Sequence, residues 1–343
     1  MSAPAAGPAP GRLQCRGRVD LGDYPVDAAW SGDGKQLLVA GGEGSLLRVA
    51  SSATAPVERI GRHQGGVLAV AWQKAGRLFA SSGQDGVVLL WDSRTLHPKR
   101  IHEGAEWSER LAFAEGGRWL AVATGRTLQV FDDAGTLRHR IAGHTGAIAA
   151  LAWRPKSTEI ATTGNNGARI HRLEPSVQSR DLPARGACLT ANWNADGRVL
   201  AAGMQDGSIY LWNAASGSQS EIPGLGARVF ATEWSANGKY LAAAAGSTLV
   251  AWESDNRSAK GAEPFELRAH SERLTALRFR PTGTWLVSAA RDRRLLLWRV
   301  GASGQPQDAH LLPDECTLLR FSRDGTLLAV GDALGGLSIY ECT

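Results

Sequence analysis

The chain has 343 residues, of which 43% are hydrophobic and 21% are charged, and its formal net charge is +5. These proportions are ordinary for a folded protein, and no apolar run approaches the length of a membrane-spanning helix. The small excess of positive charge permits an acidic partner but does not require nucleic acid.

The first eleven residues are rich in Ala, Pro and Gly and lack the early Lys or Arg and the apolar core of a secretory signal. We therefore expect a disordered tail over residues 1–11 and a single folded domain over residues 12–343. The four cysteines show no CxxC spacing, which predicts neither a zinc site nor a disulfide framework and favours a reducing cytoplasm. The abundance of Ala, Gly and Arg is typical of a bacterial source with a GC-rich genome.

A short phrase of small or apolar residues, an aromatic residue and a polar turn returns eight times along the chain. The aromatic residues are Trp30, Trp72, Phe113, Trp153, Trp193, Trp234, Phe279 and Phe321. Successive positions differ by 42, 41, 40, 40, 41, 45 and 42 residues. A near-constant period over the whole chain indicates a repeat architecture, in which units must stack to bury their apolar faces.

The second unit shows the pattern within one repeat. Apolar runs predict strands over Val67–Trp72, Leu78–Ser82 and Val87–Trp91, separated by turn residues, and a less apolar fourth strand near Lys99–His102. No stretch has a long helical period. Four short antiparallel strands in each unit predict an all-β protein whose units are the blades of a β-propeller.

The same unit carries a set of residues that resembles the WD-repeat (WD40) family. These residues are Gly61-Arg62-His63, Ser81, Asp85-Gly86 and Trp91-Asp92. The other units end differently, for example in Trp212-Asn213 and Trp298-Arg299, so each single copy is weakly specific and the eight in register carry the resemblance. The resemblance covers residues 12–342 and implies a non-catalytic β-propeller that binds other proteins.

In the WD-repeat family the chain begins with the outermost strand of the last blade. Residues 12–21 align with the fourth strand of the first unit, and the segment 314–341 ends after its third strand. The resemblance therefore implies eight four-stranded blades, with the N-terminal strand completing the last one and removing an exposed sheet edge. Seven blades, the commoner number, is the alternative.

This closure suggests a question about two cysteines. Cys15 lies in the donated strand and Cys342 ends the strand that it should join. The two thiols could face each other and form a disulfide, or remain unpaired, as the cytoplasm favours.

By the same resemblance, His63, Ser81, Asp85 and Trp91 form a buried hydrogen-bonded chain. The seventh unit repeats the set at the same offsets with His270, Ser288, Asp292 and Trp298. A hydrolase triad is the alternative for His, Ser and Asp together. Three points favour the structural interpretation. The set occurs twice, each Ser lies within a strand, and a Trp side chain occupies the Ser hydroxyl. The fourth unit keeps His144, Thr162 and Asn166 but places Arg172 in the position of the Trp.

Alanine precedes the aromatic residue in the first four units, and such small residues allow eight inner strands to converge near the axis. Units six to eight instead carry Glu233, Arg278 and Arg320 there. Charges near a ring centre must be paired or hydrated. A water-filled channel with a Glu233–Arg278 pair is one interpretation, and an anion site near Arg278 and Arg320 is the other.

In this family the loops before the first strand and between the second and third strands share one face, called the top. An exposed Trp flanked by Arg is typical of an interface anchor. Neighbouring acidic residues could neutralise these Arg side chains on a solvated rim, which is the alternative. The residues predicted to contact a partner on this face are Trp107, Arg110, Arg228, Arg273, Arg291 and Arg293.

We predict a scaffold that presents this face to a protein or peptide partner, which an acidic sequence would suit. No phosphate-binding loop, HExxH motif or Cys/His cluster is present in the sequence, so no enzymatic activity, metal or cofactor is expected. The alternative is a propeller that binds an anionic metabolite, or catalyses a reaction, in its central channel. Nucleic-acid binding is disfavoured because acidic residues interleave with the Arg residues, and a monomer is expected.

Overall fold

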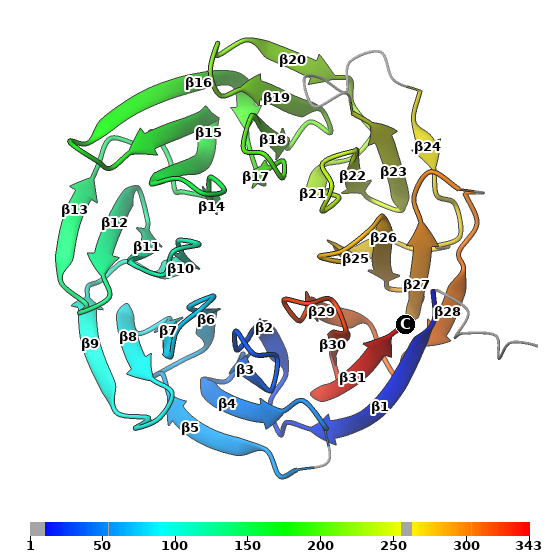
Figure 1. Ribbon diagram of the computed structural model, residues 1–343, viewed down its shortest axis with the longest axis horizontal. Helices are drawn as coiled ribbons and strands as arrows, with labels where there is room; N and C mark the ends of the chain where they lie inside the picture. The colour runs from blue at the N-terminus through cyan, green and yellow to red at the C-terminus, as the bar shows by residue number, and fades with distance from the viewer. Residues whose placement is uncertain (1–10, 54, 255–262, 303) are drawn as a thin grey trace, which may run out of the picture.

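The computed structural model describes residues 11–53, 55–254, 263–302 and 304–343. Within these residues all regular structure is β-strand, and the strands form eight sheets arranged as blades around a central opening (Figure 1). The predicted disordered tail lies outside the described residues except for Gly11, whose amide donates to the Thr343 carbonyl at 2.9 Å.

The first four blades follow one another in chain order. Blade 1 contains β2 (Pro25–Trp30), β3 (Gln36–Gly41), β4 (Ser45–Ala50) and β5 (Glu58–Arg62). Blade 2 contains β6 (Val67–Trp72), β7 (Leu78–Gly83), β8 (Val87–Asp92) and β9 (Pro98–Glu103). Blade 3 contains β10 (Ser108–Phe113), β11 (Trp119–Thr124), β12 (Thr127–Asp132) and β13 (Leu137–Ile141). Blade 4 contains β14 (Ala150–Trp153), β15 (Glu159–Arg172) and β16 (Gln178–Ala187).

The remaining blades complete the circle. Blade 5 contains β17 (Asn192–Trp193), β18 (Val199–Gly203), β19 (Ile209–Asn213) and β20 (Gln219–Ile222). Blade 6 contains β21 (Val229–Trp234), β22 (Tyr240–Ala245), β23 (Thr248–Glu253) and β24 (Phe265–Glu266). Blade 7 contains β25 (Leu274–Phe279), β26 (Trp285–Ala290), β27 (Arg294–Arg299) and β28 (Asp308–Leu311). Blade 8 contains β29 (Cys316–Phe321), β30 (Leu327–Asp332), β31 (Gly336–Cys342) and, on its outside, β1 (Leu13–Asp20).

The ring closes through the pairing of β1 with β31. The two strands are antiparallel, from Leu13 opposite Cys342 to Asp20 opposite Gly336. This pairing covers the outer edge of β31, which would otherwise expose a row of unpaired backbone groups. Eight blades closed by the N-terminal strand are thus confirmed, and the seven-bladed alternative is wrong.

The register of this closure also answers the question about the cysteines. Cys15 lies opposite Tyr340, whereas Cys342 lies opposite Leu13. Cys15 is exposed, Cys342 is buried, and both are free thiols. The suggested disulfide is therefore wrong, because the closing register does not place the two residues opposite each other.

Blade 4 departs from the regular pattern. Strand β15 bends back near Asn166 and Gly167, both of which have positive φ, and so supplies two arms of the blade. Its first arm pairs with β14 and its second with β16, and the register of the second pairing shifts between Asn165 and Gly167. The blade therefore has four arms although only three strands are delimited.

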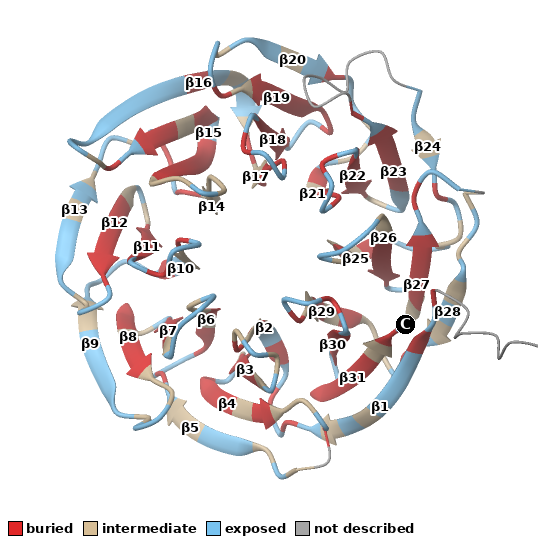
Figure 2. Ribbon diagram, viewed as in Figure 1, coloured by how far each residue is buried: buried red, intermediate tan, exposed pale blue. Residues whose placement is uncertain are grey.

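The core lies between the blades. The buried apolar residues form eight clusters, each of which joins side chains from two neighbouring blades. The second and third strands are almost wholly buried, whereas the outer strands are largely exposed (Figure 2). Strand β11, for example, is buried at all six positions. No blade buries its own faces, so the stability of each depends on its two neighbours.

Candidate protein-interaction face

Two faces of the disc differ in the connections that they carry. The top face has the loops that precede each first strand and the turns that join the second strand to the third. The bottom face has the turns from first to second strand and from third to fourth. Because the strands of each blade are antiparallel, this division holds around the whole ring.

In blade 2 the predicted hydrogen-bonded chain is present. The His63 ring contacts the Asp85 carboxylate through Nδ1 at 3.0 Å and the Ser81 hydroxyl through Nε2 at 2.9 Å. The Trp91 indole N–H donates to the same hydroxyl at 3.0 Å. Burial acts to raise the pKa of Asp85, but hydrogen bonds from two backbone amides and from His63 outweigh it and lower the pKa.

Blade 7 repeats this arrangement at greater depth. Asp292 lies 3.0 Å from His270 Nδ1, and both His270 Nε2 and the Trp298 indole lie 2.8 Å from the Ser288 hydroxyl. The side chain of Asp292 is 6% exposed, against 17% for Asp85. In both blades the hydroxyl is fully buried and shared with an indole, so neither Ser is placed to act as a nucleophile on a bound substrate.

Blade 4 contains a chain that the sequence did not predict. The Thr162 hydroxyl lies 3.0 Å from His144 Nε2 and 2.9 Å from His171 Nε2, and His171 Nδ1 lies 2.8 Å from the Ser179 hydroxyl. Sequence alignment places Arg172 in the Trp position, but the bend near Asn166 shifts the third arm by one residue. Burial lowers the pKa of His144 to about 4 and that of His171 to about 3.

The charged residues of the inner strands pair with one another. Arg278 lies 2.6 Å from Glu233, and Arg320 lies 2.5 Å from Asp27. Burial raises the pKa of the Glu233 carboxyl, while the Arg278 guanidinium opposes that rise. Both cations thus have carboxylate partners, and this arrangement favours the paired channel over the anion site.

The predicted contact residues fall into two groups. Trp107 and Arg110 belong to blade 3, whereas Arg228, Arg273, Arg291 and Arg293 belong to blades 6 and 7, across the central opening (Figure 1). Trp107 is 49% exposed. Arg110, however, donates to the Ala149 carbonyl of blade 4 at 2.9 Å, so its side chain stabilises a blade junction.

On blade 7 the arginines lie close together. The amide of Arg291 donates to the Arg273 carbonyl, and the Arg291 side chain forms an exposed ion pair with Glu315 of blade 8 at 3.1 Å. Arg293 has a φ of 61°, in the left-handed region, where blade 2 has Gly86 at 71°. A non-glycine residue in this conformation costs of the order of 1 kcal/mol, and such strain is concentrated at functional sites.

Sequence reasoning missed an apolar part of the top face. Tyr24, Val26 and Leu334, from blades 1 and 8, are 45%, 38% and 66% exposed. Beside them, a cavity of about 200 Å³ opens at the axis, lined by inner-strand residues that include Val26, Phe230 and Thr317. A Leu in the turn between β30 and β31, where polar residues are usual, is the signal that could have revealed this patch.

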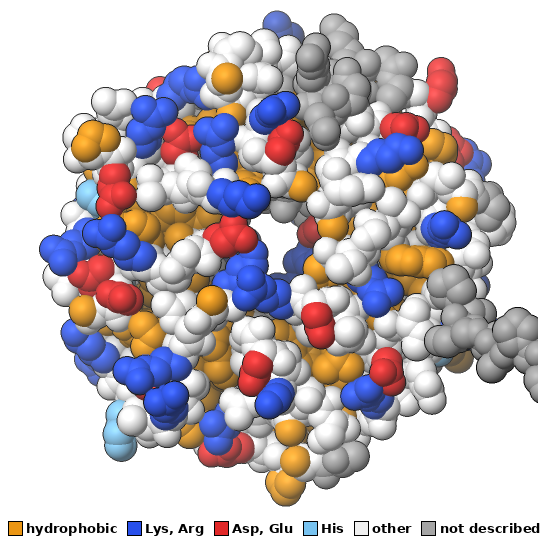
Figure 3. Space-filling view, in the orientation of Figure 1, with side chains coloured by type: hydrophobic (Ala, Val, Ile, Leu, Met, Phe, Trp, Pro, Cys, Tyr) orange, Lys and Arg blue, Asp and Glu red, His pale blue; other side chains and the backbone are white. Residues whose placement is uncertain are grey.

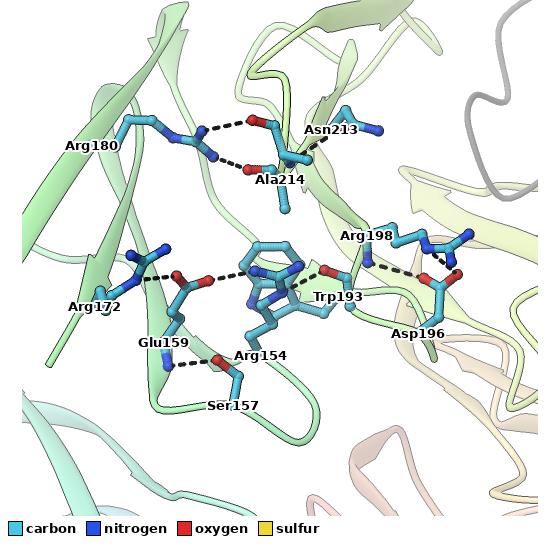
Figure 4. A network of polar contacts seen from close by, with 12 residues as sticks. Arg154, Ser157, Glu159, Arg172, Arg180, Trp193, Asp196, Arg198, Asn213 and Ala214 are labelled. Atoms are coloured by element: carbon cyan, nitrogen blue, oxygen red, sulfur yellow. Dashed lines mark hydrogen bonds and ion pairs between the residues drawn. The ribbon is translucent and has the colours of Figure 1, made fainter. Parts of the chain in front are cut away.

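Another polar cluster, on the bottom face between blades 4 and 5, is occupied by structural contacts (Figure 4). Glu159 receives ion pairs from Arg154 at 2.5 Å and from Arg172 at 2.9 Å. Arg154 also donates to the Gly197 carbonyl at 2.7 Å, and Arg180 donates to the Ala214 carbonyl. Each of these arginines therefore makes a structural contact within blade 4 or between blades 4 and 5.

Among the described residues, no group of three or more His, Cys, Asp or Glu side chains is placed to hold a metal ion. Nor does that part of the chain contain a helix with the length and apolarity needed to cross a bilayer.

Comparisons with known proteins agree with the repeat and the ring. The family model described as "WD domain, G-beta repeat" matches residues 55–92, 135–171, 181–213 and 261–299. Among solved structures, the computationally designed Ika8 protein has a TM-score of 0.79 and 19% sequence identity, over 96% of this chain and 99% of that one. At this identity the likeness shows the fold.

The curated relatives described next come from eukaryotes. The "WD repeat-containing protein slp1" of Schizosaccharomyces pombe is 25% identical over 68% of this chain and 50% of its own length. The "B-type cell cycle switch protein ccs52A" of Medicago truncatula is 24% identical over 71% and 52%. "Cell division cycle 20.1, cofactor of APC complex" of Arabidopsis thaliana is 25% identical over 77% and 60%. The chain spans about half the length of such relatives. The chain thus contains WD40 repeats in four places, closes eight blades into a β-propeller and is similar to WD-repeat proteins.

Proposed function

We propose that the protein is a non-catalytic scaffold that binds a protein or peptide partner through the top face of blades 7, 8 and 1. The partner would place acidic side chains against Arg273, Arg291 and Arg293 and an apolar side chain against Val26 and Leu334. The observation that carries the proposal is the strained Arg293, which stands where a glycine would be unstrained.

The apolar patch supports the same location. Interfaces have apolar anchors at the centre and a charged rim. The exposed Val26 lines the axial cavity, and the amide of Ala333, next to the exposed Leu334, donates to the carbonyl of Glu315, whose side chain pairs with Arg291. Trp107, also predicted as a contact, lies on blade 3 and would be reached only by a partner that spans the opening.

The relatives support a binding role. Their printed names include a cofactor of the APC complex and cell-cycle switch proteins, which are regulatory rather than enzymatic descriptions. By analogy, this chain would act as an adaptor in an assembly. Its monomeric state, cytoplasmic location and bacterial source stay predictions.

The test begins with affinity purification of the tagged protein from its native organism and identification of captured proteins by mass spectrometry. The Arg291→Glu, Arg293→Glu double variant should capture at least tenfold less of the specific partner while its melting temperature stays within a few degrees of wild type. Trp107→Ala is the control on blade 3 and should capture the normal amount. Normal capture by the double variant would place the contact elsewhere.

A further inference from the structure

A cationic groove lies on the bottom face, between blades 1 and 2, away from the proposed partner face. Its volume is about 530 Å³, within the range typical of small-ligand sites. Lys74, Arg77, Arg94 and Arg323 line it, with Asp33 as the only carboxylate of the lining. Figure 3 shows Lys and Arg side chains beside the central opening and along blade 2 on the face toward the viewer.

A side-chain bridge that joins three other pairs of neighbouring blades has no counterpart at this junction. Gln73, Arg154 and Arg280 each follow an inner-strand aromatic and donate to a glycine carbonyl in the next blade, at 2.7–2.8 Å. In blade 1 the equivalent residue is Ser31, whose hydroxyl donates to Asp33 in its own turn. The junction therefore has no such bridge.

Gly32 allows the turns of blades 1 and 2 to lie close together at the edge of the groove. A Cβ atom at this position would lie 2.4 Å from the Lys74 carbonyl oxygen, so the two turns can approach only without a side chain. The indole N–H of Trp72, which also lines the groove, is buried without a hydrogen-bond partner within the described residues. Trp30, Trp153 and Trp193 instead donate across their junctions at 2.8–3.0 Å.

The charges of the groove are not fully neutralised. Lys74 pairs with Glu115 at 2.6 Å, and Arg77 pairs with Asp92 at 2.8 Å. Arg94 and Arg323 have no carboxylate partner within the described part of the chain, although Arg323 donates one hydrogen bond to the Lys74 carbonyl at 3.1 Å. The cluster around Glu159 differs, since all three of its arginines are engaged.

The single carboxylate of the lining is itself satisfied. Hydrogen bonds from the Ser31 hydroxyl and from the Lys35 amide hold the pKa of Asp33 below its usual range. Asp33 thus stays ionised at neutral pH but is turned to its own backbone. With Lys74 and Arg77 paired to Glu115 and Asp92, the positive charge left in the groove is that of Arg94 and Arg323.

We propose that this groove binds closely spaced phosphoryl groups, with Arg94 and Arg323 as the principal ligands. A planar guanidinium presents paired N–H donors that match phosphate oxygens, and several such donors in one groove favour a polyanion over a single charge. The phosphoryl groups could belong to a free polyphosphate or to a multiply phosphorylated peptide, which share this chemistry. The site is independent of the proposed partner face.

The test is titration calorimetry of the whole protein with inorganic tripolyphosphate, a doubly phosphorylated peptide and the same peptide unphosphorylated. We expect a micromolar Kd for one phosphorylated ligand, no binding of the unphosphorylated peptide, and weakening as salt increases. Tripolyphosphate binding alone would indicate a free polyphosphate as the natural ligand, and tighter binding of the phosphopeptide would indicate a modified protein.

Charge reversal shows whether the groove is responsible. Arg94→Glu with Arg323→Glu should weaken binding at least tenfold, and Arg94→Gln with Arg323→Gln serves if the first pair fails to fold. The matched control, Arg118→Glu with Arg198→Glu, makes the same charge change at exposed positions of other bottom turns and should bind as wild type. Equal weakening by both pairs, or no binding by the wild type, would overturn the proposal. Arg291→Glu with Arg293→Glu should leave this binding unchanged, so the two proposals fail separately.

Discussion

In blade 7 the third strand presents Trp298 to the Ser288 hydroxyl, whereas in blade 4 it presents His171 to the hydroxyl of Thr162. Both contacts satisfy a buried polar group between the second and third arms. The partners on the other side differ: His270 faces the Asp292 carboxylate, whereas His144 contacts no carboxylate among the described residues. Burial and the nearby Arg169 lower the pKa of His144, and the Asp181 carboxylate opposes them by less.

This difference shows how equivalent positions in two blades can differ in their sensitivity to acid. An indole buries a large apolar surface, and its N–H donor does not titrate in the physiological range. A buried imidazole is smaller and can gain a proton, at a large cost where burial outweighs the nearby carboxylate, as it does for His144 and His171 beside Asp181. Blade 7 should therefore contribute more stability at neutral pH, and blade 4 should be the part that acid disrupts.

The largest expected effect comes from removing the indole. Trp298 is fully buried, so Trp298→Ala should lower the free energy of unfolding by about 3–5 kcal/mol through the cavity and the lost hydrogen bond. Denaturant unfolding followed by circular dichroism measures it. Trp107→Ala removes a half-exposed indole and should change stability by less than about 0.5 kcal/mol. Similar losses for the two variants would contradict the assigned burial.

Removing the carboxylate that holds the histidine should have the next effect. Asp292 accepts hydrogen bonds from His270 and from the amides of Ser271 and Arg294, so Asp292→Ala should cost about 2 kcal/mol. Asn166 occupies the same place in blade 4 without contacting His144, and Asn166→Gly should be nearly neutral because glycine tolerates the positive φ there. Thermal unfolding compares the two, and an unchanged melting temperature for Asp292→Ala would refute the network.

The third prediction concerns acid. Because the pKa values of His144 and His171 in the folded state, about 4 and about 3, lie below the ordinary 6.5, the unfolded chain takes up protons first as pH falls. The stability that neutral imidazoles provide is therefore complete above about pH 6.5 and declines toward pH 4.

The variant His171→Gln cannot gain this proton. Between pH 7 and pH 4, the free energy of unfolding of His171→Gln should fall by about 2 kcal/mol less than that of the wild type. Denaturant unfolding at several pH values gives the comparison, and His97→Gln, at an exposed turn position, should follow the wild-type profile. Parallel curves for His171→Gln and wild type would show that blade 4 is not the acid-sensitive part.

Much of the fold was predictable because the repeat is local. The second unit predicts a strand over Val67–Trp72, which is β6, and a fourth strand near Lys99–His102, which falls within β9 (Pro98–Glu103). Alternation of apolar residues with turn signals depends on neighbours along the chain, and eight copies reinforce one another.

The chain in blade 4 was not predictable in the same way. Strand β15 bends near Asn166, where its register with β16 shifts. A difference of one residue at this bend decides whether His171 or Arg172 contacts Thr162. The contact face shows a related limit. Trp107 and Arg293 have similar sequence signals, but ring closure places blades 3 and 7 on opposite sides of the opening.

The sequence by itself determined the repeat and its stacking, since each unit must bury apolar faces that only neighbouring units can cover. Eight blades closed by the first strand followed from the family resemblance, and the structure decided between eight and seven. Only the tertiary structure decided which charges meet. Arg323 of blade 8 and Arg94 of blade 2 line one groove, and Arg320 meets Asp27, because closing the circle brings the two ends of the chain together. Electrostatic contacts depend on distance in space, and a linear pattern does not contain that distance.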